Sequence, residues 1–285
     1  MSKTGLVLEG GGVRGIYTAG VLDVFMAHGL QFDGLIGVSA GAIHGCSYLS
    51  GQQGRSIRYY RKYVGDPRFM SLRSWIRTGD LVGVDFCYHE LPDRLDVYDH
   101  EAFLRNPTPF YAVCTNVETG QAEYLRITDM RGQIDVLRAS ASLPYCSRIV
   151  EIGGSKYLDG GCTDSIPAEA FARMGYDRSV VVLTRPADYR KSPEMTALAK
   201  LVYHKYPAFV RALENRHHMY NAQVEHLQAM ADEGRVFLIR PEQALEIGRL
   251  EKNPEKVQQV YDRGCADAER LLPALKAWLA GNAGT

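Results

Sequence analysis

The pentapeptide Gly37-Val38-Ser39-Ala40-Gly41 can present a nucleophilic hydroxyl. In a G-x-S-x-G sequence the serine stands on a sharp turn between a strand and a helix, and the two glycines let these elements approach closely. The N–H groups at the start of the helix favour negative charge that develops at the serine. Because glycine-rich turns with serine also cap ordinary helices, the interpretation depends on the surrounding sequence.

A glycine-rich loop, Gly10-Gly11-Gly12-Val13-Arg14-Gly15, comes before the pentapeptide and allows two interpretations. It matches G-x-G-x-x-G, a dinucleotide-binding fingerprint that needs an acidic residue at the end of the second strand. Here Asp33 stands at the start of that strand and Ser39 at its end, so the match is poor. The alternative is an oxyanion hole, because the N–H groups of the loop and of Ala40 could stabilise a negatively charged oxygen.

A nucleophilic serine needs a base. An α/β-hydrolase would place several strands before its serine and an acid and a histidine after it. Ser39 follows only about two expected strands, so this arrangement fits poorly. The other candidate is Asp159, where an apolar strand ends in the triplet Asp159-Gly160-Gly161, although Asp-Gly is also common in plain turns.

The hydrophobic pattern predicts an α/β framework around these residues. Apolar runs at residues 6–8 and 35–38 predict buried strands, and residues 15–28 and 39–49 have patterns typical of helices. This order of elements predicts a parallel sheet. Further strands are expected at residues 110–117, 122–127, 148–152, 156–158, 180–183 and 236–239, the first four as two hairpins, and helices at 167–174, 194–230 and 254–280. Without repeats or linkers, residues 1–285 are expected to form a single domain.

Composition and charge exclude several classes of protein. With 46% hydrophobic and 23% charged residues, the chain is typical of a soluble globular protein. Its 33 Lys and Arg balance 33 Asp and Glu, which argues against bulk electrostatic binding of nucleic acid. No apolar run reaches the roughly 18 residues that a membrane-spanning helix needs, and no signal sequence is visible, so we expect a cytoplasmic protein. The six cysteines have no metal-site spacing.

Together these motifs resemble the patatin-like phospholipase family, most closely its bacterial, cytosolic-type members. The family pattern is G-G-G-x-[RK]-G, then G-x-S-x-G, then D-G-[GA], and all three occur here in that order. The block Ala139-Ser140-Ala141-Ser142-Leu143-Pro144 also resembles the family's Ala-Ser-rich segment ending in proline. The resemblance covers residues 5–172, and residues 173–285 are expected to complete the domain. It implies a three-layer α/β sandwich with a mostly parallel central sheet.

The resemblance implies a Ser–Asp dyad that works through an acyl-enzyme. Ser39 would attack an ester carbonyl, and Asp159 would accept its proton and later activate water. The amides of Gly11, Gly12 and Ala40 would hold the oxyanion, each contributing roughly 3 kcal/mol to lowering the barrier. Arg14 would add positive charge to the loop, or it is simply a solvent-facing helix residue. The mechanism implies no cofactor and no metal ion.

Histidines after Asp159 could in principle complete a triad instead. They are His204, His217, His218 and His226. None is surrounded by a motif, and lone histidines on helices are mostly surface or core residues, so we favour the dyad.

We therefore expect a serine lipid acyl hydrolase that cleaves carboxylic esters of phospholipids or lysophospholipids, with neutral acylglycerols as the next candidates. A soluble carboxylesterase or thioesterase is one alternative, and a lipid-binding protein with an idle dyad is another. The intact serine, aspartate and glycine loop argue against an idle dyad. The sequence carries no signature of an oligomeric state.

Two neighbouring segments differ in charge. Residues 55–77 combine arginines with aromatic residues, which suits peripheral contact with an anionic membrane surface, such as the inner face of the membrane. On this hypothesis, neutralising Arg55, Arg58 and Arg61 would weaken binding to anionic vesicles. Residues 80–101 are acidic, however, and we favour the interpretation that the two segments pair with each other. A second basic and aromatic stretch at about residues 190–220 could form a mobile lid.

Overall fold

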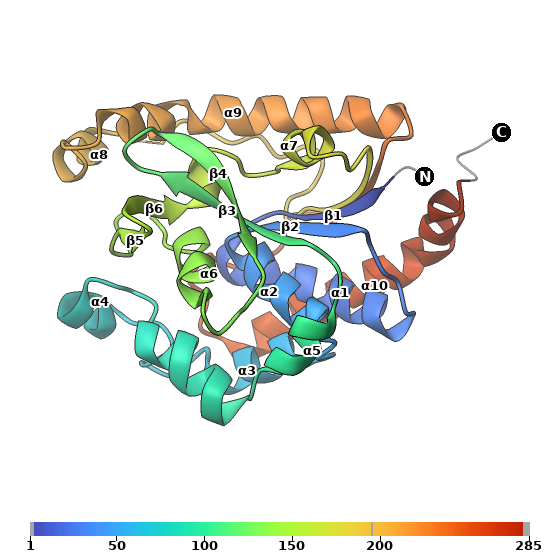
Figure 1. Cartoon of the computed structure of the whole chain (residues 1–285), viewed down its shortest axis with the longest axis horizontal. Helices are drawn as coiled ribbons and strands as arrows, with labels where there is room; N and C mark the ends of the chain where they lie inside the picture. Colours follow the sequence, from blue (N-terminus) through green and yellow to red (C-terminus); the bar gives the residue numbers. More distant parts are fainter. Residues whose placement is uncertain (1–2, 195, 282–285) are drawn as a thin grey trace.

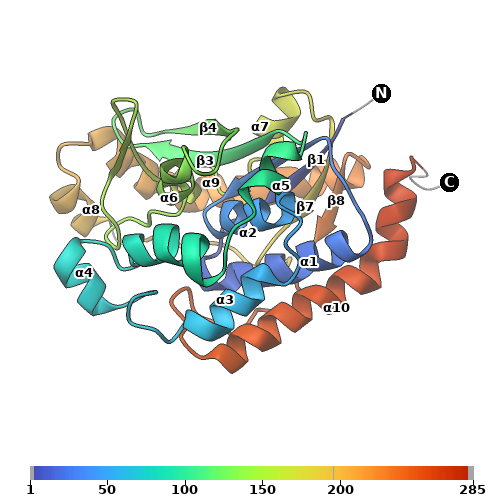
Figure 2. The ribbon, with the colours of Figure 1, turned by 60° about the horizontal axis from the view of Figure 1, so that its bottom comes forward.

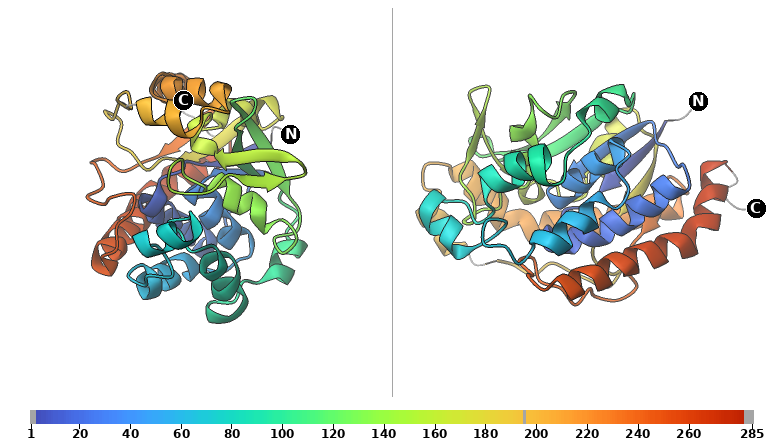
Figure 3. Two further views of the ribbon diagram at one scale, coloured as in Figure 1. Left: turned by 90° about the vertical axis from the view of Figure 1, so that its left-hand side faces the viewer. Right: turned by 90° about the horizontal axis from the view of Figure 1, so that it is seen from below.

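The computed structural model describes residues 3–194 and 196–281, and its centre is a mixed β-sheet between two layers of helices (Figure 1). The strand order is β5-β6-β3-β2-β1-β7-β8, and β4 pairs with β3 beside this path. Figure 3 shows the same layers from the end, with α9 on one side of the sheet and α1 and α2 on the other. The three-layer α/β sandwich expected from the sequence is confirmed.

Five strands form the parallel part of the sheet. They are β1 (Thr4–Leu8), β2 (Gly34–Val38), β3 (Phe110–Asn116), β7 (Arg178–Val182) and β8 (Val236–Ile239). These strands are apolar along most of their length because helices cover both faces of the sheet. The expected strands near residues 6–8, 35–38, 180–183 and 236–239 are therefore present.

The remaining strands are antiparallel and confirm both expected hairpins. β3 pairs with β4 (Gln121–Ile127), and β5 (Val150–Ile152) pairs with β6 (Ser155–Asp159). β6 also runs antiparallel to β3, with Asp159 opposite Cys114. Val113, the residue before Cys114, pairs with Val38 at the end of β2, and Ser39 follows Val38 directly. The sheet topology therefore brings the two candidate catalytic residues to the same edge.

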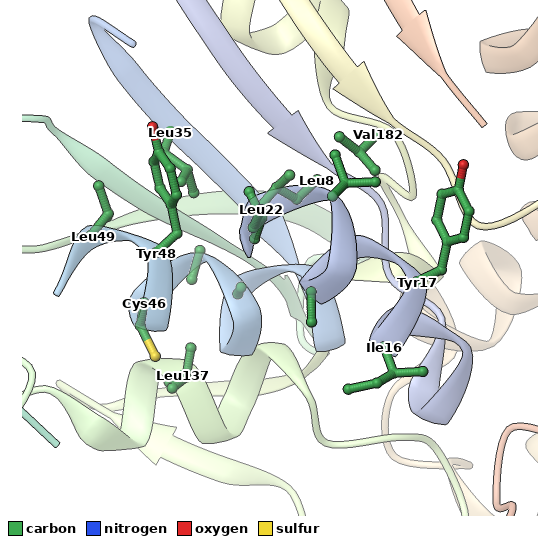
Figure 4. Close-up of a cluster of buried hydrophobic side chains, with 14 of the residues drawn as sticks. Leu8, Ile16, Tyr17, Leu22, Leu35, Cys46, Tyr48, Leu49, Leu137 and Val182 are labelled. Atoms are coloured by element: carbon green, nitrogen blue, oxygen red, sulfur yellow. The ribbon is translucent and has the colours of Figure 1, made fainter. Parts of the chain in front are cut away.

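One layer of helices is formed by the N-terminal and C-terminal parts of the chain. The 3₁₀ turn η1 (Gly12–Gly15) leads into α1 (Ile16–Ala27), and α2 (Ala40–Leu49) follows β2. The last helix, α10 (Pro254–Leu279), runs beside α1 (Figure 2). Figure 4 shows the core that these helices bury, where Leu8 of β1 lies among side chains from α1 and β7.

The opposite face of the sheet is covered by α7 (Ala168–Arg173) and α9 (Pro207–Asp232). Val7 of β1 points to this side and packs in a cluster with Phe171 and Leu227. Successive strand residues face opposite sides, so β1 supplies side chains to both cores.

Part of the stretch suggested as a lid belongs to this layer. Phe209 and Leu213, in the first turns of α9, are buried in a core cluster with Leu158 of β6. Residue 195 lies outside the described residues. A lid therefore stays a prediction, and the buried side chains of α9 restrict it to the residues before Pro207.

Helices that the sequence did not predict lie between α2 and β3. They are α3 (Arg55–Tyr63), α4 (Leu72–Thr78), the π-helix at Phe86–Leu95 and α5 (His100–Arg105). Most are short or irregular, and their charged and aromatic residues obscure the periodicity by which a helix is recognised. Within residues 3–194 and 196–281, no helix is both long enough and apolar enough to cross a membrane.

The basic and acidic segments in this region pair with each other, as we favoured from the sequence. Arg55 is 5% exposed and lies 3.4 Å from the carboxylate of Asp96, and Arg58 reaches the same carboxylate at 2.6 Å. Arg68 pairs with Glu90 at 3.1 Å. Arg55 is therefore a buried structural residue and a poor candidate for contact with a membrane, whereas the side chain of Arg58 is 54% exposed although it pairs with Asp96.

Candidate active site

Ser39 occupies the turn between β2 and α2, in the position expected of a nucleophile. Its backbone has φ 55° and ψ −123°, a left-handed conformation that is costly for any residue other than glycine. The flanking glycines explain how the turn is accommodated. A Cβ atom on Gly37 would lie 2.6 Å from the backbone of Ala42, and one on Gly41 would lie 2.5 Å from the carbonyl oxygen of Leu8.

Asp159 is 2% exposed and lies with Ser39 in the lining of one small cavity. Its Oδ1 accepts a hydrogen bond from the N–H of Gly161 at 2.8 Å, whereas Oδ2 has no hydrogen-bond partner among the described residues. Burial raises the pKa of Asp159, and the Ser39 hydroxyl and the positive charge of Arg216 oppose this rise. A buried carboxylate with one free oxygen next to a serine is equipped to accept a proton.

The block at residues 139–144 holds both of these residues in place. The Ser140 side chain, at the end of α6 (Ile134–Ser140), accepts a hydrogen bond from the backbone N–H of Ser39 at 3.0 Å. The carbonyl oxygen of Ser142 accepts one from the N–H of Asp159 at 2.8 Å. The sequence reveals this block as a motif, but its positioning role depends on contacts that only the folded chain makes.

The glycine loop packs directly against Ser39 and Ala40. A Cβ atom on Gly10 would lie 3.0 Å from the Cβ of Ser39, and one on Gly15 would lie 2.6 Å from the Cβ of Ala40. Gly12 has φ +57°, and a Cβ there would lie 2.8 Å from the carbonyl oxygen of Arg249. The loop therefore needs glycine for both close approach and conformation.

The amides proposed for the oxyanion hole surround the same serine. Gly11 and Gly12 line the small cavity with Ser39, and Ala40 lines a larger neighbouring cavity with Ser39 and Gly12. Gly12 begins η1 and Ala40 begins α2, so the N–H groups of both have no acceptor within their own helix.

The remaining motif residues support this arrangement. A Cβ atom on Gly160 would lie 2.2 Å from the carbonyl oxygen of Val113, so β3 and the triplet are in close contact. Arg216 of α9, which the sequence did not single out, donates from Nε to the carbonyl oxygen of Gly161 at 2.7 Å. It therefore helps to hold the triplet that carries Asp159.

Arg14 is 6% exposed, so the interpretation as a solvent-facing helix residue is wrong. Its side chain lines the small cavity, and its Nε has no hydrogen-bond partner among the described residues. Burial, with the nearby positive charge of Arg185, lowers the pKa of Arg14 to about 10. The guanidinium stays charged at neutral pH and faces the site.

Two cavities of different character meet at Ser39. The larger, of about 200 Å³, has a mainly apolar lining that includes Tyr59, Phe69 and Met70. The smaller, of about 40 Å³, has a polar and charged lining. Both are bordered by Gly12, Ser39, Leu143 and Arg249. An ester at Ser39 could therefore place an apolar chain on one side and a polar group on the other.

The structure brings none of the four candidate histidines to the site. His204, His217, His218 and His226 are all described, and none of them lines either cavity. A different histidine, His44 of α2, lies near Gly15 of the glycine loop but lines neither cavity. Its Nδ1 bonds to the Ser56 hydroxyl at 2.9 Å, and its Nε2 has no hydrogen-bond partner among the described residues. In the described part of the chain, no group of three or more His, Cys, Asp or Glu side chains could hold a metal ion.

The chain is similar in sequence to several known proteins. A protein of Escherichia coli, the uncharacterized protein YjjU, is 32% identical over 195 residues, which cover 67% of this chain and 55% of that protein. An uncharacterized NTE family protein of Mycobacterium tuberculosis is 24% identical over 182 residues, which cover 63% of this chain and 48% of that protein. The lysophospholipase NTE1 of Eremothecium gossypii is 27% identical over 239 residues, which cover 74% of this chain and 15% of that protein.

The chain thus spans about half the length of the first two of these relatives. Among solved structures, VipD from Legionella pneumophila aligns with a TM-score of 0.48 at 13% identity, covering 96% of this chain and 67% of that one. A model of a domain of unknown function (DUF6363) matches residues 206–280. The model described as patatin-like phospholipase matches residues 6–172, more than half of the chain, and the protein belongs to this family.

Proposed function

We propose that the protein is a serine lipid acyl hydrolase with a Ser39–Asp159 dyad. The observation that carries this proposal is the free, buried Oδ2 of Asp159 in a cavity that it shares with Ser39 and the glycine loop. A binding protein would need neither the left-handed serine nor the unpaired carboxylate oxygen, and both cost free energy.

In this mechanism, the Asp159 carboxylate accepts the proton of the Ser39 hydroxyl as Oγ attacks the ester carbonyl carbon. The negative charge that develops on the carbonyl oxygen is stabilised by the N–H groups of Gly11, Gly12 and Ala40, at roughly 3 kcal/mol for each donor. The tetrahedral intermediate collapses, and the leaving alcohol takes the proton from Asp159. Water, deprotonated by Asp159, then attacks the acyl-enzyme. As the second tetrahedral intermediate collapses, the Oγ of Ser39 takes the proton back from Asp159, and the carboxylic acid is released.

The environment of Asp159 suits this role. A base accepts a proton more readily when its pKa lies closer to the working pH, and burial raises the pKa of Asp159 in that direction. The hydrogen bond from Gly161 occupies only one oxygen, so the other is free for the serine proton.

The apolar cavity favours a lipid substrate over a small water-soluble ester. Its lining includes Tyr60, Met130 and Leu137 besides the residues named above, and such a surface gains free energy by enclosing a hydrocarbon chain. Phospholipids or lysophospholipids are the substrates we propose, and activated p-nitrophenyl acyl esters would serve as reporters.

Contact with an anionic membrane surface is a further part of the proposal, and we propose that it occurs at one end of the molecule, where apolar side chains are exposed. On α4, Leu72 and Ile76 are 70% and 77% exposed, and on α8 (Ala197–Val202), Leu201 is 73% exposed. Both helices lie at the same end in Figures 1 and 2. Arg73 and Arg77 of α4 are also exposed and would bind lipid phosphates.

The proposed function is tested by hydrolysis of p-nitrophenyl esters and lysophospholipids by the wild type and the variants Ser39→Ala and Asp159→Asn. We expect Asp159→Asn to lose about 10²–10⁴-fold in kcat, the usual contribution of a general base, and Ser39→Ala to lose all measurable turnover. His218→Asn is the matched control and should retain wild-type rates. Full activity in Asp159→Asn would move the base elsewhere.

A further inference from the structure

The small cavity beside Ser39 is unusually rich in positive charge. Its lining contains five cationic side chains from widely separated parts of the chain, namely Arg14, Arg185, Lys191, Arg216 and Arg249. The same lining contains only two carboxylates, those of Glu9 and Asp159. Four of the cations lie beyond residue 172, where the match to the patatin-like phospholipase model ends.

The nearby carboxylates are already engaged. Glu9 accepts hydrogen bonds from the hydroxyls of Thr184 and Tyr220, at 3.0 and 2.8 Å. Glu194, outside the cavity lining, lies 3.4 Å from Arg216 and 3.8 Å from Lys191. These contacts partly compensate the positive charges of Arg216 and Lys191. Arg216 also donates a hydrogen bond to the triplet that carries Asp159.

Among the described residues, the other three cations have no carboxylate in direct contact, and the negative charge of Glu9 only partly offsets the lowering of the pKa of Arg14. Within the part of the chain that the structure describes, Arg14, Arg185 and Arg249 form no ion pair with a carboxylate. The buried Nε of Arg14 also has no hydrogen-bond partner there. Arg14 is buried, whereas Arg185 and Arg249 are partly exposed. Leaving a buried cation without a direct partner is costly, so an anion in the cavity would stabilise Arg14 most and would also attract the two partly exposed guanidinium groups.

The charges also repel one another. The pKa of Lys191 falls to about 8, mainly through burial and then through the positive charges of Arg216 and Arg249. The pKa of Arg14 is lowered by the positive charges of Arg185 and Arg249 in addition to its burial. A bound anion would relieve this repulsion and restore the charged forms.

We infer that this cavity is a subsite for a phosphate group of the substrate, placed next to the scissile ester. This inference rests on the proposed function and gives it a substrate class: acyl esters that carry a phosphate close to the ester, as in a 1-acylglycerol 3-phosphate. The acyl chain lies in the apolar cavity, the ester at Ser39, and the phosphate among Arg14, Arg185 and Arg249. Guanidinium groups from three separate segments suit the several oxygens of a phosphate.

The size and connection of the cavities agree with this assignment. About 40 Å³ is room for one small anionic group, and the polar cavity borders the apolar one at Ser39. Arg249 is held close to the reaction centre, because its carbonyl oxygen accepts a hydrogen bond from the N–H of Val13 at 3.1 Å. The phosphate would therefore lie within a few bonds of the attacked carbonyl.

The test compares two substrates that differ only in the phosphate, 1-oleoylglycerol 3-phosphate and 1-oleoylglycerol, in the same neutral detergent micelles. The variants are Arg185→Gln and Arg249→Gln, both partly exposed positions, with Arg211→Gln on the surface of α9 as the control. We expect each variant to raise KM for the phosphate-bearing ester about 10-fold, the usual effect of losing one charge-assisted hydrogen bond. For Arg185→Gln, turnover of 1-oleoylglycerol should change less than about 2-fold, which also shows that the variant is folded. Arg249 also borders the apolar cavity and lowers the pKa of Asp159, so Arg185→Gln decides the comparison of the two substrates.

An equal effect on both substrates, or no effect on either, would overturn the subsite while leaving the proposed function intact. Glycerol 3-phosphate and inorganic phosphate serve as competitors to identify the source of the phosphate. One outcome would indicate a site for free phosphate and would overturn a headgroup subsite. In that outcome, one of the anions competes with the wild type but not with Arg185→Gln, and the phosphate-bearing ester has no lower KM than 1-oleoylglycerol.

If the wild type hydrolyses neither ester, the proposed function fails, and the phosphate subsite is then tested by measuring how tightly the protein binds the two lipids. Calorimetry would then measure whether the wild type binds 1-oleoylglycerol 3-phosphate more tightly than 1-oleoylglycerol. A preference that disappears in Arg185→Gln supports the phosphate subsite, and equal affinities overturn it.

Discussion

The hydroxyl of Ser140 accepts a hydrogen bond from the backbone N–H of Ser39 at 3.0 Å, across 101 positions of the sequence. This contact connects α6 to the strained turn that carries the nucleophile. Two residues later, the carbonyl oxygen of Ser142 accepts a hydrogen bond from the N–H of Asp159. One short segment therefore contacts the backbone of both members of the proposed dyad.

Replacing Ser140 should reduce catalysis more than stability. In Ser140→Ala the N–H of Ser39 loses its acceptor, and we expect kcat for p-nitrophenyl esters to fall roughly 5-fold, in line with about 1 kcal/mol for one hydrogen bond. Ser142→Ala is the matched control, because the Ser142 contact to Asp159 uses the backbone carbonyl and survives the change. Equal kcat values for the two variants would contradict the positioning role.

The glycine loop offers a test of the oxyanion hole. Gly12→Ala places a Cβ atom 2.8 Å from the carbonyl oxygen of Arg249 at a φ of +57°. The loop must shift, and loss of one oxyanion donor should lower kcat by about 10²–10³-fold. Gly29→Ala is the control, since Gly29 also has a positive φ (+63°) but no atom lies near its added Cβ. It should lower the melting temperature slightly and leave kcat unchanged. A Gly12→Ala enzyme with normal kcat would argue against this loop as the oxyanion hole.

The exposed apolar residues of α4 and α8 predict how the protein meets a lipid surface. The double variant Ile76→Ser, Leu201→Ser removes two side chains that are 77% and 73% exposed. We expect its partition onto anionic vesicles to fall about 10-fold or more, because burying each such side chain contributes roughly 1.5–3 kcal/mol. Leu104→Ser, on α5 and 53% exposed, is the control. Vesicle sedimentation gives the measurement, and unchanged partition of the double variant would exclude this end as the contact surface.

His44 predicts a loss of stability in acid. Burial lowers the pKa of His44 from its ordinary 6.5 to about 3 in the folded protein. Between these values the unfolded chain binds the proton and the folded chain does not, so the free energy of unfolding decreases as the pH falls from about 6.5 towards 3. Denaturant unfolding at several pH values should show a flatter acid slope in His44→Asn. His226→Asn, at an exposed position, should keep the wild-type slope. Parallel slopes for all three proteins would show that His44 is not responsible.

Local sequence determined much of the site and of the sheet. The strained serine turn, the glycine loop and the Asp-Gly-Gly turn are each specified within a few residues, because they depend on backbone conformations that only certain residue types allow. The apolar runs likewise predicted the parallel strands and the two hairpins. Short and irregular helices such as α5 and the π-helix at Phe86–Leu95 were missed, because tertiary packing stabilises them more than their own periodicity does.

Only the tertiary structure decided which distant groups act together. Ser140 acquires its role from a turn 101 positions away, and Arg55 is buried against Asp96 although the sequence also allowed it a place on a membrane. Arg14 and Arg249 come from opposite ends of the chain and meet in one cavity beside Ser39. Electrostatic and hydrogen-bond energies depend on distance in space and on exclusion of water, and neither quantity can be obtained from the spacing of residues along the chain.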